Sequence, residues 1–302
     1  FTAGCPDKKV DRRISQMIVP TLELLQTARK GRYALGAFNV YTVEGVRAVV
    51  AAAELTQSPV ILQLLPKALE MGSKALIALC LEAARYARAP MAVHLDHCSD
   101  PTVIRAALNA GISSVMADGS HLPYAENVAF TKEMAVLAHD HGTMIEAELG
   151  RLSGKEEDWE VAAREGCLTD VGQAIDFVGR TGVDTLAVCI GNVHGVYSRP
   201  PELDFERLAA IGQRLSIPLV LHGTSGLPDG MIARSIELGI CKFNVNTEIR
   251  QAGVAAAANY LKSAAHPELA GLMAAQIEAM QAPILSKLEL FGSAGRWDGS
   301  TI

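Results

Sequence analysis

The chain has 302 residues, of which 49% are hydrophobic and 20% charged, with a formal net charge of -6. This length fits either two small domains or one large barrel, and the hydrophobic content is ample for a sizeable core. The negative balance argues against a nucleic-acid-binding surface, which needs clustered Lys and Arg. No apolar run approaches the roughly eighteen residues of a membrane span.

Eight short apolar runs alternate with helical segments along the chain. The runs cover residues 33–39, 60–65, 91–97, 113–118, 143–149, 185–190, 218–222 and 241–246. Helices are expected near residues 43–55, 74–88, 102–110, within 121–141, and near 169–180, 205–214, 229–238 and 248–262. Such alternation predicts a parallel sheet, and eight units in about 260 residues match a single (β/α)8 TIM barrel. A doubly wound open sheet is the alternative, which the lack of a G-x-G-x-x-G fingerprint disfavours.

Three further segments complete the expected organisation. Residues 1–16 are predicted to form an N-terminal arm, and residues 17–302 one domain with a C-terminal helical extension from about residue 264. The segment 150–168 is polar and punctuated by glycine, which is typical of a lid or active-site loop. The extension, a helix over about 267–290, carries Leu and Met side chains that need burial, and so predicts a homodimer or homotetramer.

The cysteines indicate the compartment. They are scattered without a C-x-x-C pair, at Cys5, Cys80, Cys98, Cys167, Cys189 and Cys241. In a chain of this length that pattern predicts reduced thiols. The first thirteen residues are charged and lack the apolar core of a secretory signal. We therefore expect a cytoplasmic protein.

Polar side chains gather at one end of the runs. At or just after the C-terminal ends stand Asn39, Asp96, His97, Asp118, Glu148, His194, His222, Asn244 and Asn246. Barrel active sites are built on this face, so polar residues there are expected to be functional. The N-terminal ends of the runs show nothing comparable.

Three histidines from three of these ends, His97, His194 and His222, could converge on one zinc ion. Three protein ligands with an open fourth position are typical of a catalytic zinc site. The alternative is that each is only a hydrogen-bonded histidine at a strand end. Asp118 and Glu148 could ligate the same ion or a second one, or could support the histidines from behind.

Asp96 precedes His97 directly and, by strand alternation, shares a face with His94. We expect Asp96 to be the general acid/base and His94 to be a packing residue.

A second group of residues suits a phosphate. Gly223, Thr224 and Ser225 form a loop with Gly226 after the seventh run, and Asn244, Asn246 and Thr247 end the eighth run. Loops after the seventh and eighth strands are the usual phosphate site of a TIM barrel, where backbone N–H groups meet the anion. The alternative is a plain turn and a helix N-cap.

Seven segments at these run ends form a recognisable pattern: GAFNV (36–40), HLDH (94–97), MADGSH (116–121), EAELG (146–150), GNVHG (191–195), LHGTSG (221–226) and KFNVNTE (242–248). In order and spacing they resemble the class II, metal-dependent fructose/tagatose-bisphosphate aldolases, from about Val19 to about Lys262. The resemblance implies cleavage of a ketose (bis)phosphate to dihydroxyacetone phosphate and an aldehyde, through a zinc-stabilised enediolate.

The resemblance also implies roles for individual residues. Zinc would be held by His97, His194 and His222, with Asp118 and Glu148 as alternative or second-metal ligands, and Asp96 would act at the aldehyde-derived oxygen. Glu156, or else Glu157, of the loop would move the C–H proton. The substrate would contact Asn39, Gly195, Gly223, Thr224, Ser225, Asn244, Asn246 and Thr247. A monovalent cation, Na+ or K+, often assists in this family.

Two departures from the family pattern leave the ketose open. Leu65 stands where a small hydroxyl residue is usual, and Asn246 replaces the aspartate of the fructose branch and the alanine of the tagatose branch.

Other functions compete with a zinc aldolase. Lys242 shares a face with Asn244 and could serve a Schiff-base aldolase. A metal-dependent sugar-phosphate epimerase or hydrolase, or a non-catalytic sugar-phosphate-binding barrel, could use the same fold.

Overall fold

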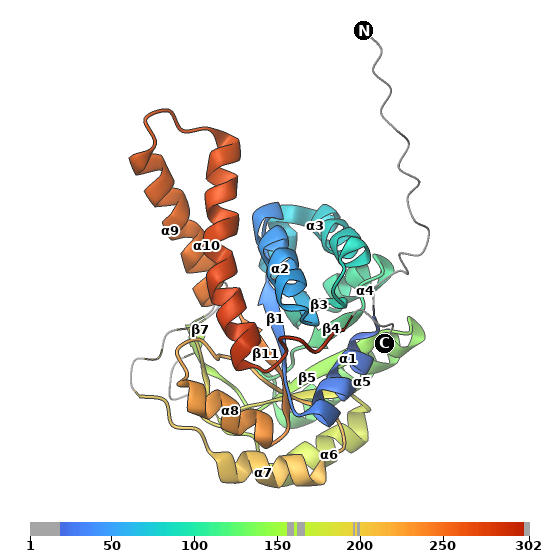
Figure 1. The fold of residues 1–302 in the computed structure, drawn as a ribbon. Helices are drawn as coiled ribbons and strands as arrows, with labels where there is room; N and C mark the ends of the chain where they lie inside the picture. The colour runs from blue at the N-terminus through green and yellow to red at the C-terminus, as the bar shows by residue number, and fades with distance from the viewer. Residues whose placement is uncertain (1–18, 156–159, 162–166, 196, 198–199, 299–302) are drawn as a thin grey trace.

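A closed barrel of parallel strands forms the centre of the molecule (Figure 1). The computed structural model describes residues 19–155, 160–161, 167–195, 197 and 200–298. The barrel strands are β1 (Leu35–Asn39), β2 (Val60–Leu64), β3 (Met91–Cys98), β4 (Ser114–Ala117), β5 (Met144–Leu149), β8 (Thr185–Val188), β10 (Leu219–Leu221) and β11 (Ile240–Val245). β1 pairs with both β2 and β11, so the sheet closes on itself. The predicted (β/α)8 barrel is confirmed, and the open sheet is excluded.

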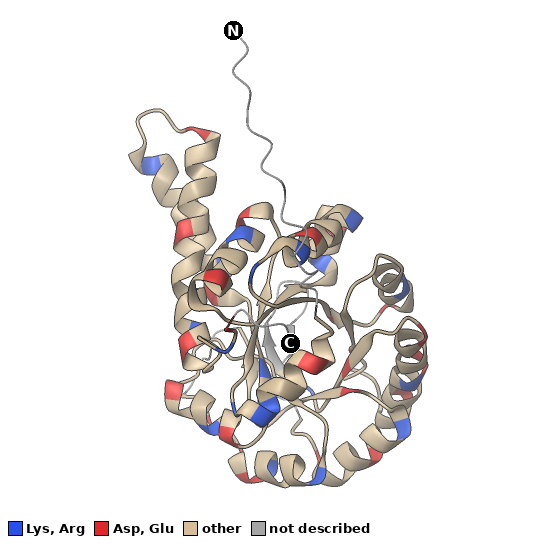
Figure 2. Cartoon of the chain, turned by 45° about the vertical axis from the view of Figure 1, so that its right-hand side comes forward, with Lys and Arg blue, Asp and Glu red and all other residues tan. Residues whose placement is uncertain are grey.

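Helices follow the barrel strands and cover the outside. They are α2 (Val43–Thr56), α3 (Pro66–Tyr86), α4 (Pro101–Asn109), α5 (Tyr124–Asp140), α6 (Val171–Thr181), α7 (Phe205–Arg214), α8 (Asp229–Glu237) and α9 (Thr247–Ser263). Several begin at a side chain that accepts a hydrogen bond from the first turn, as the cap rule expects: Thr42, Asp100, Asp170 and Asp204. Charges of both signs are mixed over the outer helices (Figure 2). None of the helices described combines the length and apolar character needed to cross a membrane.

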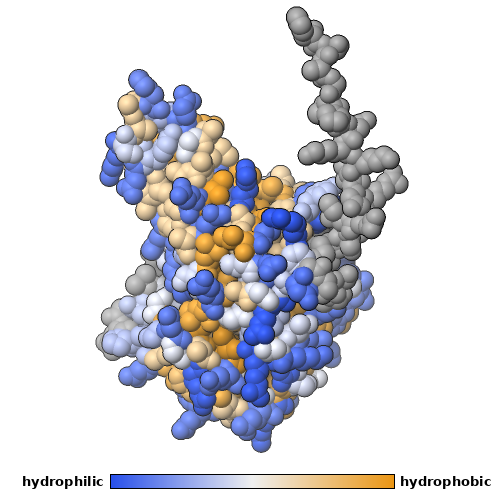
Figure 3. Space-filling model, in the orientation of Figure 1, coloured by the Kyte–Doolittle hydropathy of each residue, from blue (hydrophilic) through white to orange (hydrophobic). Residues whose placement is uncertain are grey.

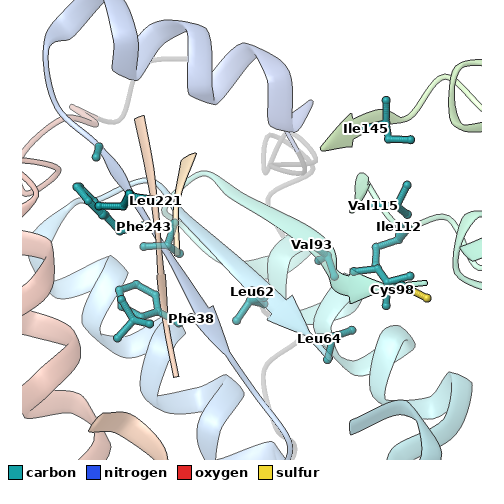
Figure 4. Packing of buried hydrophobic residues seen from close by; sticks show 14 of the residues in the cluster. Phe38, Leu62, Leu64, Val93, Cys98, Ile112, Val115, Ile145, Leu221 and Phe243 are labelled. Atoms are coloured by element: carbon teal, nitrogen blue, oxygen red, sulfur yellow. The ribbon is translucent and has the colours of Figure 1, made fainter. Parts of the chain in front are cut away.

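The main core lies between the barrel and its helices. Figure 4 shows Phe38, Leu62, Leu64 and Val93 in this layer, and each of them is fully buried. Branched and aromatic side chains suit the outward face of a parallel strand, because that face is covered along its whole length. This apolar layer fixes the barrel frame and leaves its interior free for polar residues.

A helix that the sequence analysis did not predict closes the amino end of the barrel. It is α1 (Thr21–Gly31), whose Leu24, Leu25 and Ala28 pack against Leu35 and other interior residues of the strands. Only a narrow apolar stripe marks this helix, because its other side chains are polar and face solvent. The amino end of the barrel is therefore apolar and plugged, in contrast to the carboxyl end.

Two other segments also differ from expectation. α3 begins eight residues before the predicted helix, and the two parts meet at Ser73, whose backbone is not helical (φ 52, ψ −158). The segment 150–168, expected to be a lid or active-site loop, contains the short strands β6 (Ser153–Lys155) and β7 (Glu160–Val161). β6 pairs with β7 and also with β9 (Val193–His194), so long-range pairing orders part of this segment.

The predicted C-terminal extension is present as α10 (Leu269–Leu290), which forms a projecting hairpin with α9 (Figure 1). Beyond α10 the chain returns to the barrel. The Phe291 ring stacks on Phe243 of β11 with centroids 4.7 Å apart, and Ala34 N–H donates to the Phe291 carbonyl at 3.0 Å. The extension is thus anchored in the core of the barrel.

We predict that Phe291→Ala lowers the free energy of unfolding by about 3–5 kcal/mol, because it opens a cavity against Phe243 in a closely packed core. Urea unfolding followed by circular dichroism measures this loss. Glu289→Ala, an exposed change in the last turn of α10, should stay within about 0.5 kcal/mol of the parent protein. A Phe291→Ala loss below about 1 kcal/mol would show that the extension is not anchored there.

Candidate active site

The backbone at the end of β3 brings two adjacent residues into one site. His97 has a positive φ of 42°, and the register between β3 and β4 shifts between Leu95 and Cys98. In a regular strand Asp96 and His97 would point to opposite faces. The kink lets both line the same cavity at the barrel's carboxyl end. Left-handed backbone is costly for a residue with a side chain, and such strain is concentrated at functional sites.

The three predicted histidines meet at this end of the barrel. Ring centroids are 5.0 Å apart for His97 and His194, 4.6 Å for His97 and His222, and 6.2 Å for His194 and His222. One ligand atom from each lies within 4.8 Å of the others, and the same holds for His97, Asp118 and Glu148. Both groups could therefore hold a metal ion.

His97 and Asp118 form a buried pair. His97 Nδ1 lies 2.7 Å from Asp118 Oδ2. Burial lowers the pKa of His97, but the carboxylates of Asp96 and Asp118 outweigh it and raise the pKa to about 10. Burial raises the pKa of Asp118, but hydrogen bonds from His97 and Ser120 hold it well below its usual range. The proton on His97 is one that a bound divalent cation would replace.

His222 is presented in a form suited to a metal. Burial, together with the charges of His97 and Lys242, keeps its pKa well below the usual value, so the ring is neutral. Its Nε2 lies 3.0 Å from Glu146 Oε1, which assigns the ring hydrogen to Nε2 and leaves a lone pair on Nδ1. Nδ1 lies 3.1 Å from Glu148 Oε2, yet neither atom has a hydrogen-bond partner within the described chain.

The donor set fits a divalent metal ion. Burial and the neighbouring charges of His97 and His222 also keep the pKa of His194 well below its usual value. Burial raises the pKa of Glu148 well above its usual range, and the charge of Asp118 adds to this shift. Neutral imidazoles with adjacent carboxylates are the ligands that zinc-type ions select. The two orphaned buried atoms, His222 Nδ1 and Glu148 Oε2, face each other where such an ion would satisfy both.

Asp96 is held by three amide side chains. Asn39 Nδ2 and Gln63 Nε2 donate to Oδ2 at 3.1 and 2.9 Å, and Asn244 Nδ2 donates to Oδ1 at 3.0 Å. The carboxylate is 2% exposed, so these bonds replace its hydration. They also fix the orientation of the carboxylate. Sequence reasoning missed Gln63; its signal was a single amide inside the otherwise apolar run VILQLL.

A narrow cavity connects these groups with the two glycine- and asparagine-containing loops. Its lining residues are Asn39, Asp96, His97, His194, Gly195, Gly223, Thr224, Ser225, Asn244, Asn246 and Thr247. Every predicted substrate-binding residue is among them. α9 begins at Thr247, so free backbone N–H groups of its first turn lie at this cavity, where an anion binds favourably.

The backbone of the Gly223 loop is closely packed. Gly223 has φ 63°, and a Cβ atom there would lie 2.1 Å from the Val193 carbonyl oxygen. Thr224 Oγ1 donates to the Asn244 carbonyl at 2.7 Å and so joins the two loops. Asn246 Oδ1 accepts from Tyr41 Oη at 3.0 Å. The cavity wall is thus built by residues that hold one another in place.

The other predicted residues lie elsewhere. His94 is fully buried one layer below Asp96 and its Nδ1 lies 2.8 Å from Ser114 Oγ, as expected of a packing residue. Leu65 is buried at the end of β2 and does not line the cavity. Lys242 is also buried, with Nζ 3.1 Å from Glu146 Oε1 and 2.7 Å from Asn244 Oδ1. Glu156 and Glu157 lie outside the described residues.

Comparison with known proteins identifies the family. The model of the class-II fructose-bisphosphate aldolases matches residues 19–296. The crystal structure of the YdjI aldolase from Escherichia coli K12 is 33% identical, with a TM-score of 0.82, covering 93% of this chain and 100% of that chain. A candidate fructose-1,6-bisphosphate aldolase from Coccidioides immitis is 34% identical, with a TM-score of 0.86, covering 92% and 97%.

A more distant neighbour supports the fold alone. The fructose-bisphosphate aldolase of Campylobacter jejuni is 22% identical, with a TM-score of 0.75, covering 92% of this chain and 96% of that chain. The match of the family model over nearly the whole described barrel, together with the two relatives above 30% identity, shows that the chain belongs to the class-II fructose-bisphosphate aldolase family.

Proposed function

We propose that the chain is a zinc-dependent aldolase that cleaves a ketose phosphate into dihydroxyacetone phosphate and an aldehyde. The observation that carries the proposal is a three-histidine group, two of whose members, His97 and His194, line one cavity together with Asp96 and the Gly223 and Thr247 loops. An epimerase or hydrolase could use the histidines, but the family match favours carbon–carbon bond cleavage.

The residues would divide the chemistry as follows. Zinc on His97, His194 and His222 would supply Lewis acidity at the ketone and hydroxyl oxygens of the substrate. The Asp96 carboxylate takes the hydroxyl proton of the aldehyde-forming half during cleavage and returns it during condensation. Its three amide donors hold it in one orientation at the cavity.

The loops around Gly223 and Thr247 would hold the phosphate of the dihydroxyacetone half. Gly223 and Ser225 line the cavity, and Thr247 begins a helix whose N-terminus favours an anion. Holding the phosphate there places the reacting carbon near the histidines and lowers the entropic part of the barrier. A monovalent cation beside the phosphate, Na+ or K+, remains a prediction from the family resemblance.

We assign the C–H proton transfer to Glu156. β6 places Gly154 beside His194 in parallel register. Glu156 follows two residues later, outside the described residues, and its role is taken from the family resemblance. Asp118 and Glu148, with His97, offer ligand atoms for a second divalent ion.

The environment of Lys242 favours this mechanism over a Schiff base. The side chain is fully buried, and its ammonium group donates to Glu146 and Asn244. A Schiff-base lysine must reach the substrate carbonyl as a neutral amine. Lys242 is instead held against a carboxylate below the cavity.

We also propose a reducing, cytoplasmic environment and a homo-oligomer. The five cysteines described are all free, which suits a reducing compartment. The α9–α10 hairpin exposes Val254, Leu261 and Leu269 at 66%, 54% and 72%. In Figure 3 apolar patches, interrupted by polar residues, lie at the base of this hairpin and lower on the same face. A second copy of the chain would cover such a surface, which a monomer rarely leaves exposed.

Metal removal tests the proposed activity directly. The protein should exchange the prochiral C–H proton of dihydroxyacetone phosphate for deuterium in D2O, lose this exchange with a chelator and regain it with zinc. Proton NMR follows the exchange, which requires no knowledge of the aldehyde. His222→Ala should fail to exchange even with zinc added. Exchange that survives chelation would refute the zinc mechanism.

Asp96→Asn should separate the two halves of the reaction. We expect condensation of dihydroxyacetone phosphate with glyceraldehyde or its phosphate to fall by about 10²–10⁴-fold, the usual contribution of a general acid/base. Deuterium exchange should be largely retained, because Asp96 acts on the other half. Asp100→Asn is the matched control: Asp100 is an exposed N-cap, and asparagine caps equally well. Equal loss of both reactions in Asp96→Asn would contradict the assignment.

Light scattering tests the oligomer. The particle mass should be two or four times the 32.1 kDa of the chain. Leu261→Lys combined with Leu269→Lys should lower it to one chain, because the charges would be buried in the interface. Val136→Lys, an equally polar change at a 56% exposed site on α5, should leave the mass unchanged. A monomeric parent protein would remove the proposal.

A further inference from the structure

A buried ion pair lies inside the barrel, below the cavity. Glu146 of β5 and Lys242 of β11 are both fully buried, and Lys242 Nζ is 3.1 Å from each carboxylate oxygen of Glu146. Neither residue lines the cavity, so neither contacts substrate directly. Burying two charges is costly, and well-packed apolar side chains often serve stability equally well. The pair therefore calls for an explanation beyond stability.

One end of the pair contacts a histidine of the metal group. Glu146 Oε1 accepts the hydrogen of His222 Nε2 at 3.0 Å. With that hydrogen fixed on Nε2, the lone pair of His222 lies on Nδ1, the nitrogen that faces Glu148. A carboxylate behind a ligating histidine sets its tautomer and ring orientation, and removing such a partner typically costs metal affinity.

The other end of the pair leads to Asp96. Lys242 Nζ donates to Asn244 Oδ1 at 2.7 Å, and Asn244 Nδ2 donates to Asp96 Oδ1 at 3.0 Å. An ammonium group can only donate, so it requires the amide oxygen on its side. The amide NH2 is consequently turned toward the Asp96 carboxylate. The reverse orientation would place an oxygen against that carboxylate.

We propose that Glu146 and Lys242 are a positioning pair, which sets the tautomer of His222 through one partner and the orientation of the Asn244 amide through the other. The inference rests on the proposed function and adds residues to it. One buried charge pair thereby aligns the metal group and the acid/base from below, without contacting substrate.

Two double variants test the His222 arm. Glu146→Gln with Lys242→Met removes both charges but keeps an oxygen acceptor for His222. Glu146→Leu with Lys242→Met removes the charges and the acceptor. We expect zinc affinity, measured by competition with a chromophoric chelator, to stay near that of the parent in the glutamine variant. In the leucine variant it should fall about 10–100-fold, the usual effect of losing such a partner. Equal affinity in both variants would overturn this arm.

The Asn244 arm has its own readout. The glutamine variant, saturated with zinc, should lose condensation activity while retaining deuterium exchange, because only the support of Asp96 is weakened. Unchanged condensation would overturn this arm. Arg234→Met with Glu237→Gln, which neutralises an exposed pair of 2.7 Å on α8, is the control and should alter neither quantity.

A third measurement, made on the parent protein, needs no bound metal. Nitrogen-15 NMR of the chelator-treated protein should show His222 as the neutral Nε2–H tautomer, assigned by loss of the signal in His222→Asn. An Nδ1–H tautomer would refute the inference. A parent protein that showed the Nε2–H tautomer but bound no zinc would instead refute the proposed function and leave the positioning of His222 intact.

Discussion

The excess of buried negative charge at one end of the barrel is the constraint on which the site depends. Asp96, Asp118, Glu146 and Glu148 are each 9% exposed or less, within one ring of strands. Lys242 offsets only one of these carboxylates. Isolated buried carboxylates are strongly disfavoured. The carboxylates of Asp96 and Asp118 raise the pKa of His97, and burial together with the charge of Asp118 raises the pKa of Glu148. A divalent cation among the histidines would relieve both effects at once.

The fold tolerates that concentration of charge because hydrophobic packing in other parts of the molecule stabilises it. The layer outside the strands and the plug of α1 at the amino end bury the large hydrophobic side chains. The interior of the barrel is then graded from apolar at the plug, through the Glu146–Lys242 layer, to the polar cavity. Stability and chemistry occupy opposite ends of the same strands, as is usual in this fold.

The repeating and alternating features of the sequence were enough to predict the barrel and the residues at its carboxyl end. Alternating runs and helices identified the barrel, and the carboxyl ends of the runs identified the histidines and Asp96, because parallel strands bring those ends together. The kink at His97 was not predictable, since a positive φ at a histidine leaves no local signal. Three features were missed because each depends on partners distant in sequence. Gln63 contacts Asp96, α1 packs on the interior side chains of the strands, and β6 pairs with β9, which contains His194.

The β6–β9 pairing also connects the active-site loop to a metal-type residue. Gly154 is in register with His194. The carbonyl oxygen of Val193, the residue before His194, occupies the space that a Cβ atom at Gly223 would need. Backbone contacts therefore join the loop, the His194 segment and the phosphate-type loop in series. A movement of the loop would be transmitted to both neighbours, because close-packed backbone has no slack to absorb it. β6, the His194 segment and the Gly223 loop are therefore coupled through their backbones, and a displacement of β6 would also shift His194.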